Sequence, residues 1–146
     1  MRSLNNTKTV VSLLGTGVTN GATVTANIDT LGFDHAIVEL FLGTADVVSN
    51  NPSVLKLAES DDTVVTNFAN ITAAVGDTAW TIPNSDTSSP NVYRFNVDLR
   101  GRKRYLKLTC SPTTTQQAVM IAHLGNAEVA ADASTTKAGV HALVNC

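Results

Sequence analysis

The chain has 146 residues, of which 43% are hydrophobic and only 15% are charged, and its formal net charge at pH 7 is -2. This length predicts one domain, which buries enough surface to fold without a metal ion or a disulfide. The weak acidity argues against a nucleic-acid-binding domain, because phosphate neutralisation requires a basic face. The sequence has neither a signal-peptide pattern nor an apolar run long enough for a membrane helix, so we expect no membrane partner.

Short apolar runs bounded by Gly, Pro, Asn, Asp or Ser recur along the chain, which is typical of successive β-strands. Between the first two runs, the glycines from Gly15 to Gly21 predict an opening hairpin. The most apolar run, HAIVELFL, predicts a central strand that is buried on both faces. In chain order the expected strands are Thr9–Leu14, Ala22–Ile28, His35–Leu42, Val54–Ala58, Thr63–Phe68, Ala79–Ile82, Val92–Leu99, Tyr105–Cys110 and Gln117–Leu124.

The stretch from Val92 to Cys110 has the clearest alternation of apolar and polar residues, with a period of two. Its two halves flank a basic segment around Gly101, where a hairpin reversal favours a residue that adopts positive φ. We therefore expect two paired strands joined by a tight turn. Together with the other runs, this stretch predicts an all-β, antiparallel two-sheet β-sandwich of about eight to nine strands, a jelly roll or a related Greek key.

We expect the β-sandwich domain to span residues 9–124, between an N-terminal arm of residues 1–8 and a C-terminal arm or tail of residues 125–146. The tail is rich in alanine and threonine and lacks a firm period-two pattern, so it suits either a weak helix or an extended arm. Neither arm carries enough large apolar side chains to form a core. One of the two is expected to reach a neighbouring molecule.

Nothing in the sequence predicts an enzyme, a metal site or a cofactor. Cys110 and Cys146 lack zinc or redox spacing and are expected to be free thiols. No GxSxG motif is present, and we expect the histidines to be structural or solvated. The three histidines are His35, His123 and His141.

Two other patterns resemble ligand sites but are better explained as turns. Glu59, Asp61 and Asp62 form an acidic cluster without the DxDxDG spacing of a calcium loop, so we expect a solvated turn. Gly15 and Gly17 form a GTG without the helix of a dinucleotide-binding site, which predicts a flexible hairpin turn instead.

One dense cluster of positive charge stands out on this otherwise slightly acidic chain. Two interpretations remain open for it: the charges keep a hairpin tip soluble and protect a sheet edge, or they contact carboxylates of a partner protein. Only Tyr93 and Tyr105 are available for base stacking beside the cluster, so nucleic-acid binding is not expected. The candidate partner-contact residues are Arg100, Arg102, Lys103 and Arg104.

Three segments carry a resemblance to a known class of proteins. They are TLGFDHAIVELFLGTADV, SVLKLAESDD and VYRFNVDLRGRKRYLKLT, which together lie between Thr30 and Thr109. In these segments the chain resembles small structural proteins encoded in the head-gene clusters of tailed bacteriophages, the capsid decoration or cement proteins. The resemblance covers about half of the chain and includes no catalytic motif.

The resemblance implies a jelly-roll-like protein, made in the bacterial host cytoplasm, that sits on the exterior of the capsid in the virion. Its implied partners are the major capsid protein, whose neighbouring subunits it would clamp, and further copies of itself as a dimer or trimer. Two alternatives remain: a glycan-binding β-sandwich module and another head or tail component of the virion. A glycan-binding module would normally expose several aromatic residues, whereas aromatic residues make up only 5% of this chain.

Overall fold

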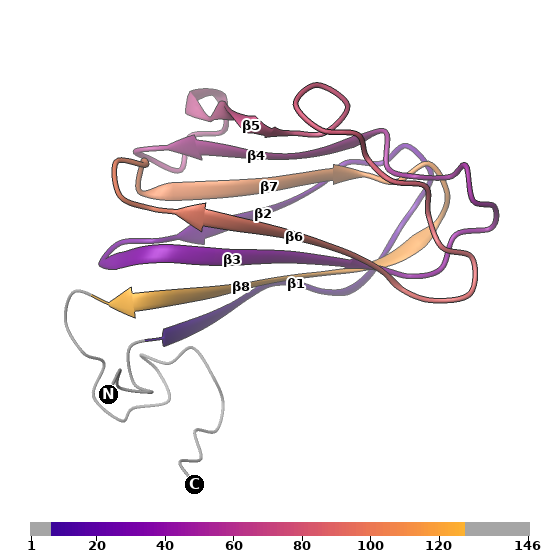
Figure 1. Cartoon of the computed structure of the whole chain (residues 1–146), viewed down its shortest axis with the longest axis horizontal. Coiled ribbons are helices and arrows are strands. Elements are labelled where there is room, and N and C mark those ends of the chain that lie inside the picture. The colour runs from indigo at the N-terminus through magenta and orange to yellow at the C-terminus, as the bar shows by residue number, and fades with distance from the viewer. Residues whose placement is uncertain (1–6, 128–146) are drawn as a thin grey trace, which may run out of the picture.

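Two antiparallel four-stranded sheets pack face to face in the computed structural model, which describes residues 7–127 apart from the side chains of residues 12, 14, 16 and 127 (Figure 1). The first sheet has the order β1-β8-β3-β6 and the second has the order β2-β7-β4-β5. The strands are β1 (Thr7–Val18), β2 (Val24–Asp29), β3 (Phe33–Leu42), β4 (Val54–Ser60), β5 (Ala69–Val75), β6 (Asn91–Asp98), β7 (Tyr105–Ser111) and β8 (Gln116–Ala127).

The path of the chain between the sheets defines the topology. Every connection between consecutive strands switches sheet except the one from β4 to β5: strands β1, β3, β6 and β8 lie in the first sheet, and β2, β4, β5 and β7 lie in the second. This strand order is that of a jelly roll. The predicted antiparallel β-sandwich is therefore confirmed, and of the two predicted topologies it is the jelly roll.

The core is formed by alternate side chains of both sheets, as the period-two pattern of the sequence predicts. On β3, Ala36, Val38 and Leu40 point inward, and each is at most 1% exposed. Large aliphatic side chains from the second sheet meet them across the interior. The leucine and methionine side chains of the core that are at most 1% exposed are Leu40, Leu42, Leu55, Leu57, Leu106, Leu108, Met120 and Leu124.

The predicted hairpin between Val92 and Cys110 is wrong in its pairing, although its buried side is correct. Strand β6 pairs with β3 in the first sheet, whereas β7 pairs with β2 and β4 in the second sheet. The turn at Gly101, with φ of 81°, thus connects a strand of the first sheet to a strand of the second instead of joining two paired strands. An alternating pattern determines which side of a strand is buried, but it does not determine the strand's partner.

The predicted opening hairpin is also wrong, for the same reason. Strand β1 pairs with β8, and β2 pairs with β7, so the connection between β1 and β2 crosses from one sheet to the other. Gly15 and Gly17 lie within β1, beside a shift in the register with β8 between Leu13 and Thr16. Gly15 has φ of 51°, which a glycine adopts without strain.

Two other expected strands are absent from the described part of the chain. In place of a strand at Thr63–Phe68, a short 3-10 helix spans Val65–Asn67, and the next strand is β5. The carboxylate of Asp62 accepts hydrogen bonds from the Val64 amide at 2.9 Å and from Asn67 Nδ2 at 2.8 Å, which favours this turn. The segment 79–82 forms only an isolated bridge, between Gly76 and Trp80.

The sheet strands also extend past the expected limits of the domain. Strand β1 begins at Thr7 and β8 continues to Ala127, so Thr7, Lys8 and residues 125–127 lie in the first sheet. The remainder of both predicted arms lies outside the described residues. No helix in the described part of the chain is long and apolar enough to cross a membrane.

We predict that Leu108→Ala lowers the free energy of unfolding by about 2 to 5 kcal/mol, because it removes core contacts of a fully buried side chain and leaves a cavity. The matched control is Leu31→Ala. Leu31 is 65% exposed, so its truncation is expected to change stability by less than about 0.5 kcal/mol. Urea denaturation of the three proteins measures both values, and equal effects of the two substitutions would contradict the described core.

Candidate functional site

The four predicted partner-contact residues lie together on the turn between β6 and β7, and each is exposed. Each also has an acidic partner within this chain, so the turn contains four ion pairs. Salt bridges of this exposed kind contribute little to stability, but they neutralise the cluster. The pairs are Arg100 with Asp98 at 2.7 Å, Arg102 with Glu59 at 3.3 Å, Lys103 with Asp61 at 3.4 Å, and Arg104 with Asp29 at 2.7 Å.

The carboxylates at this turn respond to the cations beside them. Hydrogen bonds from the Arg100 side chain and backbone lower the pKa of Asp98 to about 2. The Arg104 guanidinium donates two hydrogen bonds to Asp29, and these lower the pKa of that carboxyl despite partial burial. A partner carboxylate would have to displace these internal acceptors. Partner contact by the basic turn therefore stays a prediction.

The acidic residues once considered as calcium ligands have other roles. Glu59 and Asp61 accept the cations of the basic turn, and Asp62 orders the 3-10 turn that follows it. Among residues 7–127, no group of three or more histidine, cysteine or acidic side chains is placed to hold a metal ion.

The described histidines lie apart from each other and from Cys110. His35 is exposed at the start of β3, where its ring packs against Gly125. His123 lies on β8 between the Thr9 hydroxyl at 3.4 Å and a carboxylate oxygen of Glu39 at 3.6 Å. Cys110 is a free thiol in the core, as expected, and burial raises its pKa to about 12. His141 and Cys146 lie outside the described residues.

One side of the first sheet carries an apolar surface that the sequence did not reveal. We call it the outer face: the side of the first sheet that points away from the core. No element among residues 7–127 packs over it. The apolar side chains on this face are Val11, Ile37, Phe41, Val92, Val119 and Ile121, of which Val11 is 45% and Val92 53% exposed while the others are half-buried.

An ion pair between Glu39 and Arg94 lies in the middle of the outer face. Glu39 on β3 lies between Arg94 on β6 and Ile121 on β8. Arg94 donates to Glu39 Oε1 from Nε at 2.8 Å and from Nη2 at 2.6 Å. The Glu39 side chain is only 9% exposed, although it lies on an open sheet face. Because an unpaired carboxylate in such surroundings is costly, Arg94 stabilises this charge.

Strand β6 is an edge of the first sheet, and part of its backbone points away from any partner. The Leu99 amide donates to the Asp34 carbonyl at 2.8 Å, directly across the β3–β6 pair. Peptide groups alternate in direction along an antiparallel strand, so those of Arg94 and Asn96 point to the open side. Within residues 7–127 their outward amides and carbonyls have no hydrogen-bond partner.

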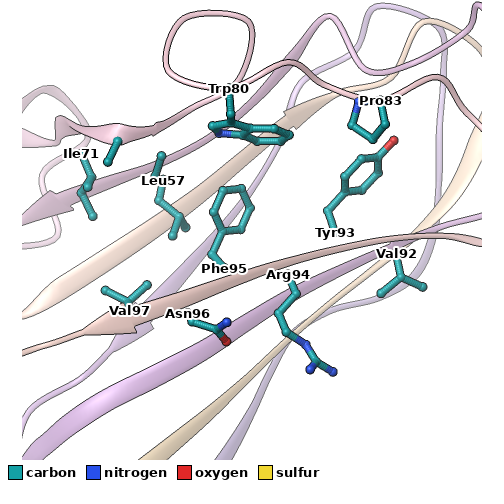
Figure 2. Close-up of a pocket in the computed structure, with 12 residues that line it drawn as sticks. Leu57, Ile71, Trp80, Pro83, Val92, Tyr93, Arg94, Phe95, Asn96 and Val97 are labelled. Carbon is teal, nitrogen blue, oxygen red and sulfur yellow. The ribbon is translucent and has the colours of Figure 1, made fainter.

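A groove of about 610 Å³ lies along this edge, between β6 and the second sheet. Figure 2 shows the Trp80 ring above Phe95, with Tyr93 beside them under Pro83. The rings of Trp80 and Phe95 meet edge to face, with centroids 5.9 Å apart. Leu57, Ile71 and Val97 line the rest of the apolar wall.

Hydrogen bonds to the backbone and to one carboxylate hold the segment that carries Trp80 in place. The Gly76 amide donates to the Leu55 carbonyl at 2.9 Å, and the Ile82 amide donates to the Asp77 carboxylate at 2.9 Å. A Cβ on Gly76 would lie 2.6 Å from Ile82, so only glycine allows this approach. The period-two pattern between Val92 and Cys110 indicated that one side of β6 is buried, but the expected pairing of β6 with β7 concealed the open edge of β6.

Comparison with known proteins gives a limited result. No protein-family model matches the chain, and no curated protein matches it. Among solved structures, the "Structure of infectious bursal disease virus Gx strain" is similar to this chain, with 12% sequence identity and a TM-score of 0.49. The match covers 86% of this chain and 33% of that chain, so this chain spans about a third of that chain's length.

We predict that Asp29→Asn lowers stability at neutral pH and that the difference from wild type shrinks as the pH falls below about 4. The pKa of Asp29 is lowered in the folded protein from the ordinary value of 3.8. Its ionised form therefore stabilises the fold above that value, and this stabilisation is lost as the carboxyl becomes protonated. Thermal melts between pH 2.5 and pH 7 measure the difference. In an Arg104→Gln background the pH dependence should be smaller, and an unchanged dependence would contradict the assigned pair.

We predict that Arg94→Ala costs about 1 to 3 kcal/mol of stability, because it leaves the largely buried Glu39 carboxylate without its cation. Arg100→Ala is the matched control, since Arg100 and Asp98 are both exposed to solvent. Urea denaturation at pH 7 compares the two variants, and Arg100→Ala should be close to wild type. A loss from Arg94→Ala no larger than that from Arg100→Ala would contradict the role given to the outer-face ion pair.

Proposed function

We propose that this protein is a structural component of a phage virion, which binds the outer surface of the capsid and stabilises it by clamping neighbouring major capsid subunits. The observation that carries the proposal is the outer face, an apolar sheet surface around the Glu39–Arg94 pair that no element of residues 7–127 covers. The sequence resemblance to capsid decoration or cement proteins supplies the identity of the partner.

The chemistry of the outer face suits contact with another protein. A solvated sheet face normally carries polar side chains, whereas this one presents Val11, Phe41, Val92 and Ile121. Contiguous exposed apolar area of this kind marks interaction surfaces. Interface cores are depleted in charged residues, and the charges on this face are already paired with each other.

Binding to the assembled lattice explains how such a protein stabilises a shell. A ligand that binds the assembled state and not the separate subunit shifts the equilibrium towards assembly. Each capsid offers many equivalent sites, so a modest free energy at each site adds up over the shell. Self-association as a dimer or trimer would match the symmetry axes of the lattice.

The glycan-binding alternative has weaker support. Trp80 and Phe95 are close to each other, but their rings pack edge to face inside the groove. A sugar-stacking platform instead presents the flat side of an aromatic ring to the solvent. A role elsewhere in the head or tail would use the same apolar outer face. Binding assays with heads and with tail components distinguish that role from the capsid role.

The first test is co-sedimentation of the purified protein with assembled phage heads, compared with unassembled major capsid protein, followed by heating of the heads. We expect saturable binding to heads alone and a higher disruption temperature of the shell. Failure to bind heads of the cognate phage would contradict the proposal, and binding to a glycan array or to tail components would replace it.

A pair of double variants tests whether the outer face is the contact. Val11→Glu with Val119→Glu places charge on the outer face, and we expect at least about a tenfold loss of affinity for heads, or about 1.4 kcal/mol. The matched control, Leu31→Glu with Val65→Glu, changes two residues that are 65% and 71% exposed elsewhere. Equal binding by both double variants would contradict the outer face as the contact surface.

A further inference from the structure

We propose that the free edge of β6 accepts an extended segment from a second copy of this chain, the apolar run of residues 139–144. The added segment would pair with the backbone of β6 and place alternate side chains in the groove beside Trp80. The inference concerns self-association. It goes beyond the proposed capsid role, and the purified protein alone can test it.

The backbone of the β6 edge has hydrogen-bonding groups that point away from β3. The outward peptide groups of Arg94 and Asn96 are unpaired among residues 7–127, and their natural complement is another extended chain. Peptides commonly bind in this way, with main-chain hydrogen bonds supplying affinity and pockets for alternate side chains supplying specificity.

The four edge strands of the two sheets differ in length and in regularity of register. Strand β1 has two shifts in its register with β8, and β5 has one in its register with β4. Strand β2 has only six residues. Strand β6 has eight residues in unbroken register with β3 and contains neither proline nor lysine, the residues that usually protect an edge. Strand β6 is thus the longest edge strand with an unbroken register among residues 7–127, and its outer side is open to pairing.

The groove beside the β6 edge can receive side chains of an added strand. Side chains of both orientations on β6 line it, Phe95 and Val97 from the inner side and Arg94 and Asn96 from the outer side. A strand added to β6 would therefore run along the mouth of the groove. Its inward side chains would enter the apolar space between Trp80 and the second sheet (Figure 2).

The chain carries one suitable segment outside the described residues. The sequence GVHALV at positions 139–144 is apolar except for one histidine, and it is long enough to pair with most of β6. Residues 128–138 separate it from the end of β8, and fully extended they span up to about 36 Å. That length is sufficient to reach a neighbouring molecule.

Sheet topology favours a second copy over the chain's own segment. Strands β6 and β8 are both antiparallel to β3, so they end at the same end of the sheet. At that end the chain leaves β6 through the basic turn towards β7. The chain's own segment would have to cross β3 and pass around this turn, whereas a second copy reaches the open edge from outside. Exchange between two copies closes as a symmetric dimer.

The experiment compares self-association of full-length variants by sedimentation equilibrium. Asn96→Pro removes an outward donor and blocks the edge, yet it leaves the β3 pairing intact, because the Asn96 amide points away from β3. Asn96→Ser, which keeps that amide, is the matched control. A donor variant carries Val140→Asp and Leu143→Asp. We expect wild type and Asn96→Ser to associate alike, and Asn96→Pro and the donor variant to associate at least tenfold more weakly.

Mixing supplies a sharper result. Asn96→Pro keeps an intact donor segment and the donor variant keeps an intact β6 edge. An equimolar mixture should therefore form heterodimers, whereas each variant alone should remain monomeric. Trp80 is the single tryptophan of the chain, and its fluorescence should shift over the concentration range in which association occurs. Circular dichroism checks that each variant is folded. If Asn96→Pro does not fold, competition by a synthetic peptide of residues 138–146 against wild-type association takes its place.

Three outcomes would overturn the inference: equal association of all variants, no heterodimer in the mixture, or no competition by the peptide. A concentration-independent Trp80 signal that the donor variant abolishes would show that the segment binds its own molecule, and it would also overturn the inference. None of these outcomes bears on binding to phage heads. A failure here is therefore distinguishable from a failure of the proposed function.

Discussion

The burial of one side of each strand between two sheets is the constraint on which the rest of this structure depends. Leu40, Leu108 and Met120 meet in an interior that excludes water almost completely. Strands with one apolar side can satisfy this constraint only in two facing layers. The jelly-roll path then separates strands that are neighbours in sequence, so the basic turn between β6 and β7 has to span the core. The ion pairs of this turn and the open edge of β6 both follow from that crossing.

A domain of two four-stranded sheets completes its core but leaves other surfaces uncovered. Among residues 7–127, no element covers the apolar side chains around Glu39 on the outer face, and none pairs with the outward peptide groups of β6 beside the groove. Both features are costly in an isolated monomer, since apolar surface and free strand edges promote association. They are compatible with a protein whose working state is an assembly. The proposed capsid contact uses the outer face and the proposed strand exchange uses the backbone edge of β6, and the two surfaces adjoin at Arg94.

The sequence predicted the fold class and the buried sides of β6 and β7, but not the pairing of the strands. Alternation at Tyr93, Phe95 and Val97 is a local property and is visible in the sequence, whereas the pairing of β6 with β3 joins residues 49 to 63 positions apart. Strand β5 was missed because its small residues give weak alternation. The outer face was missed because the apolar residues of HAIVELFL were all assigned to burial. The basic cluster was found, but its internal partners are distant in sequence.

The distribution of charge decides which kind of recognition this chain is suited to. Arg94 and the four cations of the basic turn all have carboxylate partners within the molecule, and these five account for half of the ten lysine and arginine residues. Lys107, in turn, lies over the Phe68 ring. Because these five cations are already paired, contacts that do not use them depend on close apolar fit and on backbone hydrogen bonds. Such contacts are insensitive to ionic strength compared with salt bridges. The two proposed surfaces supply that chemistry, whereas the basic turn does not.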